Sequence, residues 1–223
     1  MPDYISFCII GSYIILLNIL FTKFNLIKDK KNTSFHKKFI ENKTEPPFSG
    51  GIFLILTIFL FLDLDWFFKS LLLPIFLIGF FSDLNLFKSV NLRFYLQLIS
   101  VLIIFYYLNL YVQSIRIDFI DNFLNNYFFK IFFTTFCILI LINGSNFLDG
   151  VNTLVIGYYL LILIFVSLLG NEFNNFIYIE FIYLLIFALS ILLILNCFNL
   201  LLLGDNGSYL LSVFVGIYLI DLS

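Results

Sequence analysis

Three aspartates of the chain stand in short polar segments between long apolar runs. They are Asp83 in GFFSDLN, Asp149 in NGSNFLDGVNT and Asp205 in LGDNGS. Carboxylates among amides and glycines offer a few hard oxygen ligands with room for water, which is how proteins hold Mg²⁺ together with a substrate phosphate. The three segments therefore predict one site that binds a metal ion and phosphate groups.

The segment around Asp149 carries polar residues at every third position, so a helix would place them on one face: Asn143, Asn146, Asp149 and Asn152. Three amides and a carboxylate are expensive in lipid, and such residues normally line a cavity or meet a ligand. The alternative is a ladder of hydrogen bonds between neighbouring helices. We expect a ligand-binding face here and keep the ladder open.

Glycines flank the other polar segments. Gly204 and Gly207 free the backbone on either side of Asp205, and Ser208 suits an N-cap of the apolar run that follows. Gly50-Gly51 lets another backbone or a ligand come close. The alternatives are a plain capping turn after Asp205 and a rigid helix start at the glycine pair.

Cations follow Asp83 closely. With Lys88 and Arg93 nearby, Asp83 is a candidate for holding a metal ion or organising a phosphate site, the alternative being a helix end solvated at the headgroups. Lys43 is a third cation suited to attracting a phosphate. His36 stands in a lysine-rich stretch and is expected to be solvated. Neither a disulfide nor a metal site is expected from the widely spaced cysteines Cys8, Cys137 and Cys197.

The composition decides which solvent surrounds these segments. Hydrophobic residues make up 62% of 223 positions and charged residues 12%, whereas a soluble domain has about a quarter charged residues. The net charge of −2 by itself predicts nothing about nucleic acid, but the sequence lacks the basic stripe that such binding requires, so no nucleic-acid partner is expected. The chain is therefore expected to be an integral membrane protein.

Membrane helices need roughly 20 apolar residues. The sequence predicts an all-α, polytopic transmembrane bundle in one domain, 1–223, with about eight spans: 4–22, 50–62, 66–81, 93–112, 128–143, 153–169, 177–200 and 208–221.

Orientation follows from lysine and arginine, which are retained in the cytoplasm. The stretch 23–48 holds seven of the twelve basic residues, so we place it inside and the N-terminus outside. Alternation then puts 82–92, 143–152 and 201–207 inside, which gives nine basic residues inside against three outside. The polar motifs all fall on the cytoplasmic side, although the charge argument did not use them.

Four of these motifs, taken in order, carry a resemblance to a known family. Gly50-Gly51, Ser82-Asp83-Leu84, NGSNFLDGVNTL at 143–154 and LGDNGS at 203–208 resemble the polyprenyl-phosphate N-acetylhexosamine-1-phosphate transferases. This family, of the glycosyltransferase family 4 type, includes the phospho-N-acetylmuramoyl-pentapeptide translocase and the enzymes that start O-antigen and teichoic acid linkage synthesis. The similarity covers about residues 44–216 and looks most like the branch that initiates O-antigen or capsule synthesis.

The resemblance implies transfer of a sugar-1-phosphate from a UDP-sugar to undecaprenyl phosphate, with release of UMP, at the cytoplasmic face of the bacterial inner membrane. Asp205 matches the residue that binds Mg²⁺, with Mn²⁺ as an alternative ion. Asp149, together with Asn146, matches the motif for nucleotide-sugar binding and catalysis, and Asp83 matches the second aspartate of a catalytic pair.

Three departures from the family pattern matter. Ser82 stands where the first aspartate of that pair is usual, and Asn152 where a second aspartate follows Asp149. The family also continues after a stretch like 204–221 with more spans and a His-rich loop, which we expect this chain to lack. We expect the substrates to be contacted by Ser82, Lys88, Arg93, Asn146 and Asn152.

Two other readings stay open. An inactive or truncated relative would only bind partner glycosyltransferases in the membrane. A small transporter would place ionisable residues at mid-bilayer in broken helices, whereas the three aspartates are expected at helix ends. The identity of the N-acetylhexosamine, the downstream glycan and the oligomeric state do not follow from the sequence.

Overall fold

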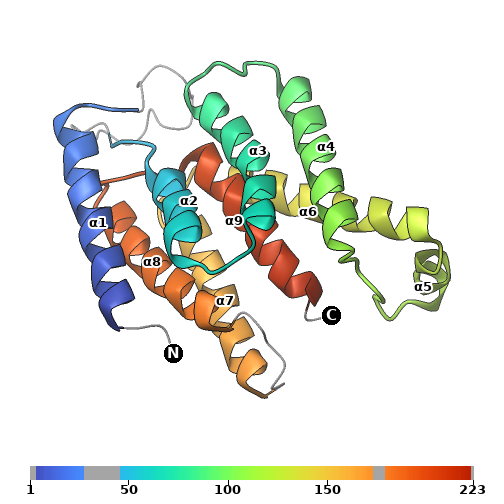
Figure 1. The fold of residues 1–223 in the computed structure, drawn as a ribbon. Coiled ribbons are helices and arrows are strands. Elements are labelled where there is room, and N and C mark those ends of the chain that lie inside the picture. Colours follow the sequence, from blue (N-terminus) through green and yellow to red (C-terminus); the bar gives the residue numbers. More distant parts are fainter. Residues whose placement is uncertain (1–3, 28–45, 173–178, 222–223) are drawn as a thin grey trace.

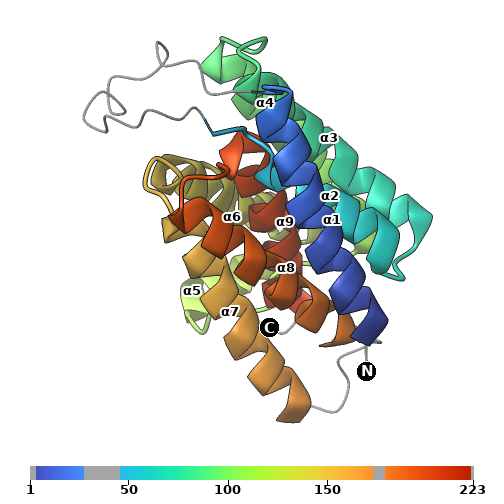
Figure 2. The same ribbon diagram turned by 90° about the vertical axis from the view of Figure 1, so that its left-hand side faces the viewer.

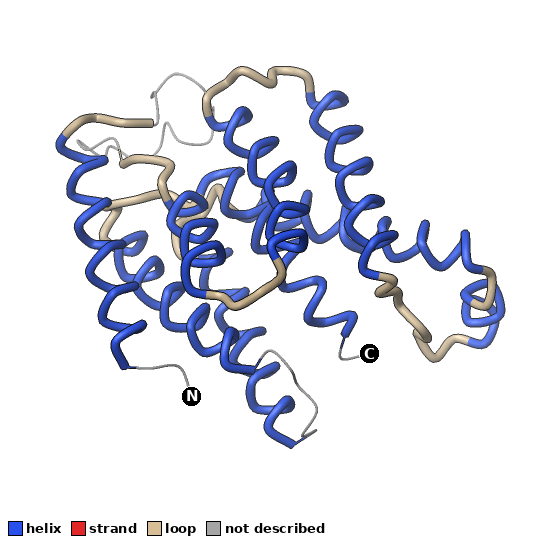
Figure 3. Tube along the Cα trace, viewed as in Figure 1, coloured by secondary structure: helices blue, strands red, loops and turns tan. Residues whose placement is uncertain are grey.

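The computed structural model describes residues 4–27, 46–172 and 179–221, and these residues form helices and connecting loops without a strand (Figures 1 and 3). The predicted all-α class is therefore confirmed. The helices of the described residues are α1 (Tyr4–Lys23), α2 (Gly50–Phe61), α3 (Trp66–Asp83), α4 (Val90–Leu108), α5 (Asp118–Leu124), α6 (Tyr127–Leu148), α7 (Leu154–Glu172), α8 (Ile179–Cys197) and α9 (Gly204–Asp221).

Eight of these helices correspond one by one to the eight predicted spans, and the seven-residue α5 is the addition. Within the described ranges, four helices are long and apolar enough to cross a membrane: α1, α3, α4 and α6. Shorter apolar helices lie at Gly50–Phe61, Leu154–Leu168 and Phe181–Cys197. The chain is thus a multi-pass helical membrane protein.

Helix α9 is the centre of the bundle. Its residues from Asn206 to Tyr218 are all buried, and it packs against α2, α3, α6 and α7 (Figure 2). A helix that is buried all round needs apolar or small residues on every side, and α9 supplies both. Gly207 and Gly216 lie where neighbouring side chains come so close that a Cβ would collide with them.

Hydroxyl groups join the helices inside the apolar bundle. Ser212 of α9 lies 2.5 Å from the Ser145 hydroxyl of α6 and 2.7 Å from the Tyr159 hydroxyl of α7. Tyr13 of α1 donates to the Phe53 carbonyl of α2 at 2.9 Å. Hydrogen bonds of this kind hold membrane helices together where apolar burial gives no preference over lipid. Cys8, Cys137 and Cys197 are free cysteines.

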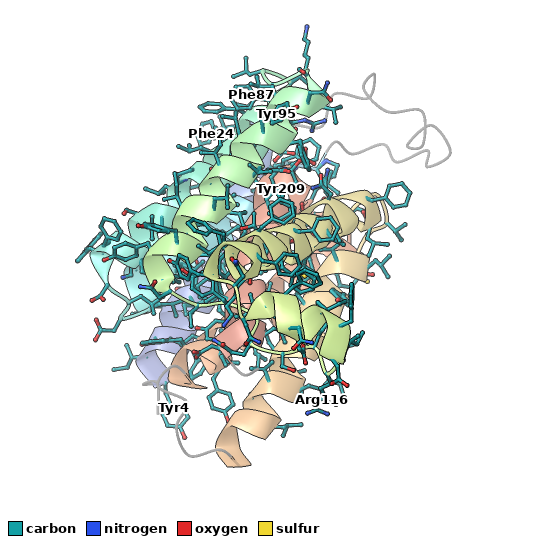
Figure 4. The ribbon with its side chains drawn as sticks, turned by 90° about the vertical axis from the view of Figure 1, so that its right-hand side faces the viewer. Tyr4, Phe24, Phe87, Tyr95, Arg116 and Tyr209 are labelled. Atoms are coloured by element: carbon teal, nitrogen blue, oxygen red, sulfur yellow. The ribbon has the colours of Figure 1, made fainter. Side chains whose placement is uncertain are left out.

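The long helices alternate in direction between two ends of the bundle. Tyr4, where α1 begins, lies at the same end as Arg116, whereas Phe24 and Phe87 lie at the opposite end (Figure 4). The α3–α4 connection is therefore at the end where α1 finishes, as the predicted alternation requires. Most of the lysine-rich stretch, including Lys43 and His36, lies outside the described residues.

Candidate functional site

The site begins where the chain before α2 meets the chain before α9. Leu202 N donates to the Pro47 carbonyl at 2.9 Å, and Gly50 N donates to the Leu202 carbonyl at 3.1 Å. Gly51 N lies 3.1 Å from the side-chain oxygen of Asn206. These bonds fix the first turn of α9 against the first turn of α2.

Gly51 makes this approach possible. A Cβ on Gly51 would collide with the Asn206 side-chain oxygen and would lie 2.7 Å from the Asn206 carbonyl carbon. The expectation that the glycine pair lets another backbone come close is confirmed, and the neighbour is the backbone that carries Asp205.

Replacing Gly51 by alanine should therefore destabilise the bundle. Overpacking against a backbone costs about 1–3 kcal/mol, which corresponds to roughly 2–4 °C of Tm for each kcal/mol. Thermal denaturation of the purified protein in detergent measures this change. Gly144→Ala is the matched control, because a Cβ at Gly144 would have no neighbour within 4 Å other than its own helix backbone. A Gly51→Ala protein as stable as Gly144→Ala would contradict this packing.

Asp83, the last residue of α3, caps α9. Its Oδ1 accepts a hydrogen bond from Asp205 N at 2.9 Å and its Oδ2 accepts one from Asn206 N at 3.1 Å. A carboxylate on the free N–H groups of a helix start satisfies them and interacts favourably with the helix dipole. Gly204 has φ +78°, and a Cβ there would lie 2.8 Å from Asp83 Oδ2. The prediction that Ser208 is the N-cap is wrong, since α9 begins at Gly204.

The Asp205 side chain of α9 contacts residues of α3 and α4. Its Oδ2 accepts hydrogen bonds from Ser82 Oγ at 2.5 Å, from Arg93 Nη1 at 3.2 Å and from the Tyr209 hydroxyl at 3.4 Å. Arg93 Nη1 also donates to Ser82 Oγ at 2.6 Å. The Arg93 and Asp205 side chains are 22% and 24% exposed. The carboxylate is therefore held from one side and remains accessible to solvent.

Charges of both signs gather around this carboxylate. The negative charges of Asp205 and Asp149 both act on Asp83, and Arg93 is the cation in contact with Asp205. The Nε of Arg93 is buried and has no hydrogen-bond partner among the described residues. The structure thus brings together Ser82, Asp83, Arg93 and Asp205, with Asp149 within electrostatic reach.

The polar residues of the Asp149 segment do not share one helix face. Helix α6 ends at Leu148 with Asp149 at its C-cap, so Asn152 lies beyond the helix, in the turn before α7. Asn152 donates to the side-chain oxygen of Asn199. Asn143 reaches Gln97 of α4 at 3.4 Å. The prediction of a shared helix face is therefore wrong, because the chain turns between Asp149 and Asn152. Asn143 instead forms a hydrogen bond between helices, which was the alternative.

The remaining predicted residues lie at the edge of the site. Asn146 is partly exposed on the last turn of α6, and Lys88 is exposed in the α3–α4 connection. Tyr209 was not predicted as a site residue. It is fully buried, and Figure 4 shows it farther into the bundle than Tyr95. Its position one helical turn after Asp205 is the signal that would have found it.

The donor set fits Mg²⁺ when the ion is shared with a substrate. Among the described residues no three His, Cys, Asp or Glu side chains form a ready metal cluster. Mg²⁺ commonly binds through one or two carboxylates and completes its coordination with water and phosphate oxygens. Asp205 is such a carboxylate, because the described hydrogen bonds to its side chain all end on one oxygen, Oδ2.

Comparison with models of known protein families gives a match. The model of glycosyl transferase family 4 matches residues 66–223, which is more than two thirds of the chain. The matched region contains the Asp83, Asp149 and Asp205 segments, whereas Gly50-Gly51 precedes it. A search among curated proteins found no matching relative.

Proposed function

The chain belongs to glycosyl transferase family 4, and we propose that it transfers N-acetylhexosamine-1-phosphate from a UDP-sugar to undecaprenyl phosphate, releasing UMP. Family membership gives the coarser activity, transfer of a sugar phosphate by a membrane protein. The single observation that supports the finer proposal most is the accessible Asp205 carboxylate, which α3 and α4 hold at the first turn of α9.

The reaction is a displacement at phosphorus. An oxygen of the lipid phosphate attacks the β-phosphorus of the UDP-sugar and forms the new P–O bond. The bond from that phosphorus to the bridging oxygen breaks, and its electron pair leaves with UMP. A phosphate monoester is largely ionised at pH 7, since its second pKa is about 6. The attack therefore needs no strong base, which makes Ser82 in place of an aspartate compatible with activity.

The residues of the site have separate roles in this proposal. Asp205 would hold Mg²⁺, which supplies neutralising charge for the diphosphate and the departing UMP. Asp83 keeps Asp205 in place through its two backbone hydrogen bonds. Exposed Lys88 attracts the lipid phosphate. The nucleotide sugar would lie on the side of Asn146, Asp149 and Asn152. Positioning and electrostatics would then provide most of the catalysis.

Location and pathway belong to the proposal as well. The excess of basic residues in the loops at the site end favours the cytoplasmic side of a bacterial inner membrane. There the product would be the first lipid-linked sugar of a cell-surface glycan such as O-antigen or capsule.

The test is an assay of UMP release. Membranes that contain the chain are given UDP-N-acetylglucosamine, Mg²⁺ and undecaprenyl phosphate, and UMP is measured against a sample without the lipid. Parallel samples with UDP-N-acetylgalactosamine and UDP-glucose identify the sugar. Release that depends on the lipid and on an N-acetylhexosamine is expected. If none of the three nucleotide sugars yields UMP above the lipid-free sample, the proposal is wrong.

Ser82→Ala should reduce this activity moderately. The substitution removes a 2.5 Å hydrogen bond to Asp205 and an acceptor for Arg93, but leaves both charges in place. A hydrogen bond to a charged group contributes about 1.5–3 kcal/mol, so kcat should fall at least about tenfold. Ser89→Ala is the control, because Ser89 only caps α4. Equal activity of the two variants would remove Ser82 from the site.

A further inference from the structure

Arg93 lies so close to Asp205 that its positive charge would repel a cation bound to that carboxylate. Its Nη1 lies 3.2 Å from Asp205 Oδ2, and a metal ion arriving on the same carboxylate would meet this positive charge at close range. Like charges so close together repel each other, so the pair with Arg93 and the bond to a metal compete for Asp205.

In this position Arg93 uses only part of its hydrogen-bonding capacity. Both described bonds come from Nη1, one to Ser82 Oγ and one to Asp205 Oδ2. The Nε group is buried and has no partner among the described residues. A guanidinium has a planar fork of donors that matches two phosphate oxygens at once. A phosphate therefore offers Arg93 the bidentate partner that Asp205 does not provide.

We propose that the positive charge of Arg93 opposes a metal ion on Asp205 until a substrate phosphate draws the guanidinium away, so that the metal and the phosphate bind cooperatively. This inference rests on the proposed function, in which Asp205 holds the metal. Arg93 is then a positioning residue that couples two ligands. Because such coupling is reciprocal, the metal also strengthens phosphate binding. The phosphate comes either from the nucleotide diphosphate or from the lipid monoester.

The test measures Mn²⁺ binding without turnover. The purified chain in detergent is titrated with Mn²⁺, and free Mn²⁺ is read by electron paramagnetic resonance. The titration is made under three conditions (arms): without any phosphate compound, with UDP-N-acetylglucosamine alone, and with undecaprenyl phosphate alone. Each is corrected by a sample without protein. The wild type should bind Mn²⁺ about tenfold more tightly in at least one phosphate arm, and that arm identifies the phosphate that moves Arg93.

Variants separate competition from a general effect of charge. Arg93→Gln should bind Mn²⁺ about tenfold more tightly than the wild type without phosphate, and should lose most of the phosphate effect. Lys23→Gln removes an exposed positive charge at the end of α1, which the proposed site does not use, and should behave like the wild type. If Arg93→Gln does not purify as a single species, Arg93→Lys replaces it, because lysine keeps the charge but lacks the planar fork, and its phosphate effect should be smaller.

The possible failures are distinguishable. If Arg93→Gln binds Mn²⁺ no more tightly than Lys23→Gln, or no phosphate arm changes wild-type binding, the competition is refuted while the metal role of Asp205 stands. If Asp205→Asn binds Mn²⁺ as well as the wild type in every arm, both the competition and the proposed metal site are refuted.

Discussion

Asp205→Asn is expected to lower kcat for UMP release by about a thousandfold, because a metal clamp supplies several kcal/mol of charge stabilisation in the transition state. Asparagine has the same shape as aspartate and still offers an oxygen to Ser82 and Arg93, whose bonds to Asp205 join three helices. The substitution therefore removes the negative charge while it retains most of the packing.

The measurement is the UMP assay at increasing Mg²⁺ concentrations, together with the Tm of the purified variant. Asp118→Asn, at the start of α5, is the matched control far along the chain from the site. Activity within tenfold of the wild type, or recovery at high Mg²⁺, would show that the Asp205 charge is not the main contribution to the metal site.

Hydropathy predicted the helices well, because it follows directly from the bilayer. A helix that crosses an apolar layer must be apolar along its length, so the long helices appear as runs in the sequence. Their alternation then brings polar ends such as Ser82-Asp83 and Gly204-Asp205 together at one end of the bundle, whatever contacts they make there.

Helix boundaries at the polar motifs were less predictable, because tertiary contacts set them. Ser208 has the local properties of an N-cap, yet α9 starts four residues earlier, since Asp83 of another helix binds the N–H groups of Asp205 and Asn206. Such a cap lies more than a hundred positions away along the chain. No local pattern around Asp205 reveals it.

Helix α5 shows the same limitation in a loop. Asp121 accepts hydrogen bonds from Ser114 Oγ at 2.6 Å and from Ile115 N at 2.9 Å. These bonds lower the pKa of Asp121 below its usual value, and they close a short loop onto a helix of seven residues. The apolar residues of α5 have helical spacing: Phe119, Ile120, Phe123 and Leu124. They cover only about two turns, which is shorter than the window that identifies a helix in a sequence.

Asp83→Asn should reduce both activity and stability, whereas Asp205→Asn should mainly reduce activity. Asparagine keeps one acceptor oxygen and places an amide N–H group against one of the two backbone N–H groups at the start of α9. An unsatisfied buried donor costs about 1–3 kcal/mol, or roughly 2–4 °C of Tm for each kcal/mol. Displacement of the first turn of α9 also moves Asp205, and kcat should fall about a hundredfold.

Comparison of Asp83→Asn with Asp205→Asn then assigns the two carboxylates. Positioning by Asp83 predicts a lower Tm and weaker Mn²⁺ binding in Asp83→Asn, whereas Asp205→Asn should lose the metal with little change in Tm. An Asp83→Asn protein that is inactive, yet as stable as the wild type and unchanged in Mn²⁺ affinity, would instead place Asp83 in the chemical step. The cap that Asp83 forms on α9 would then be incidental to its function, and the Ser82-Asp83 segment would contribute a catalytic carboxylate directly.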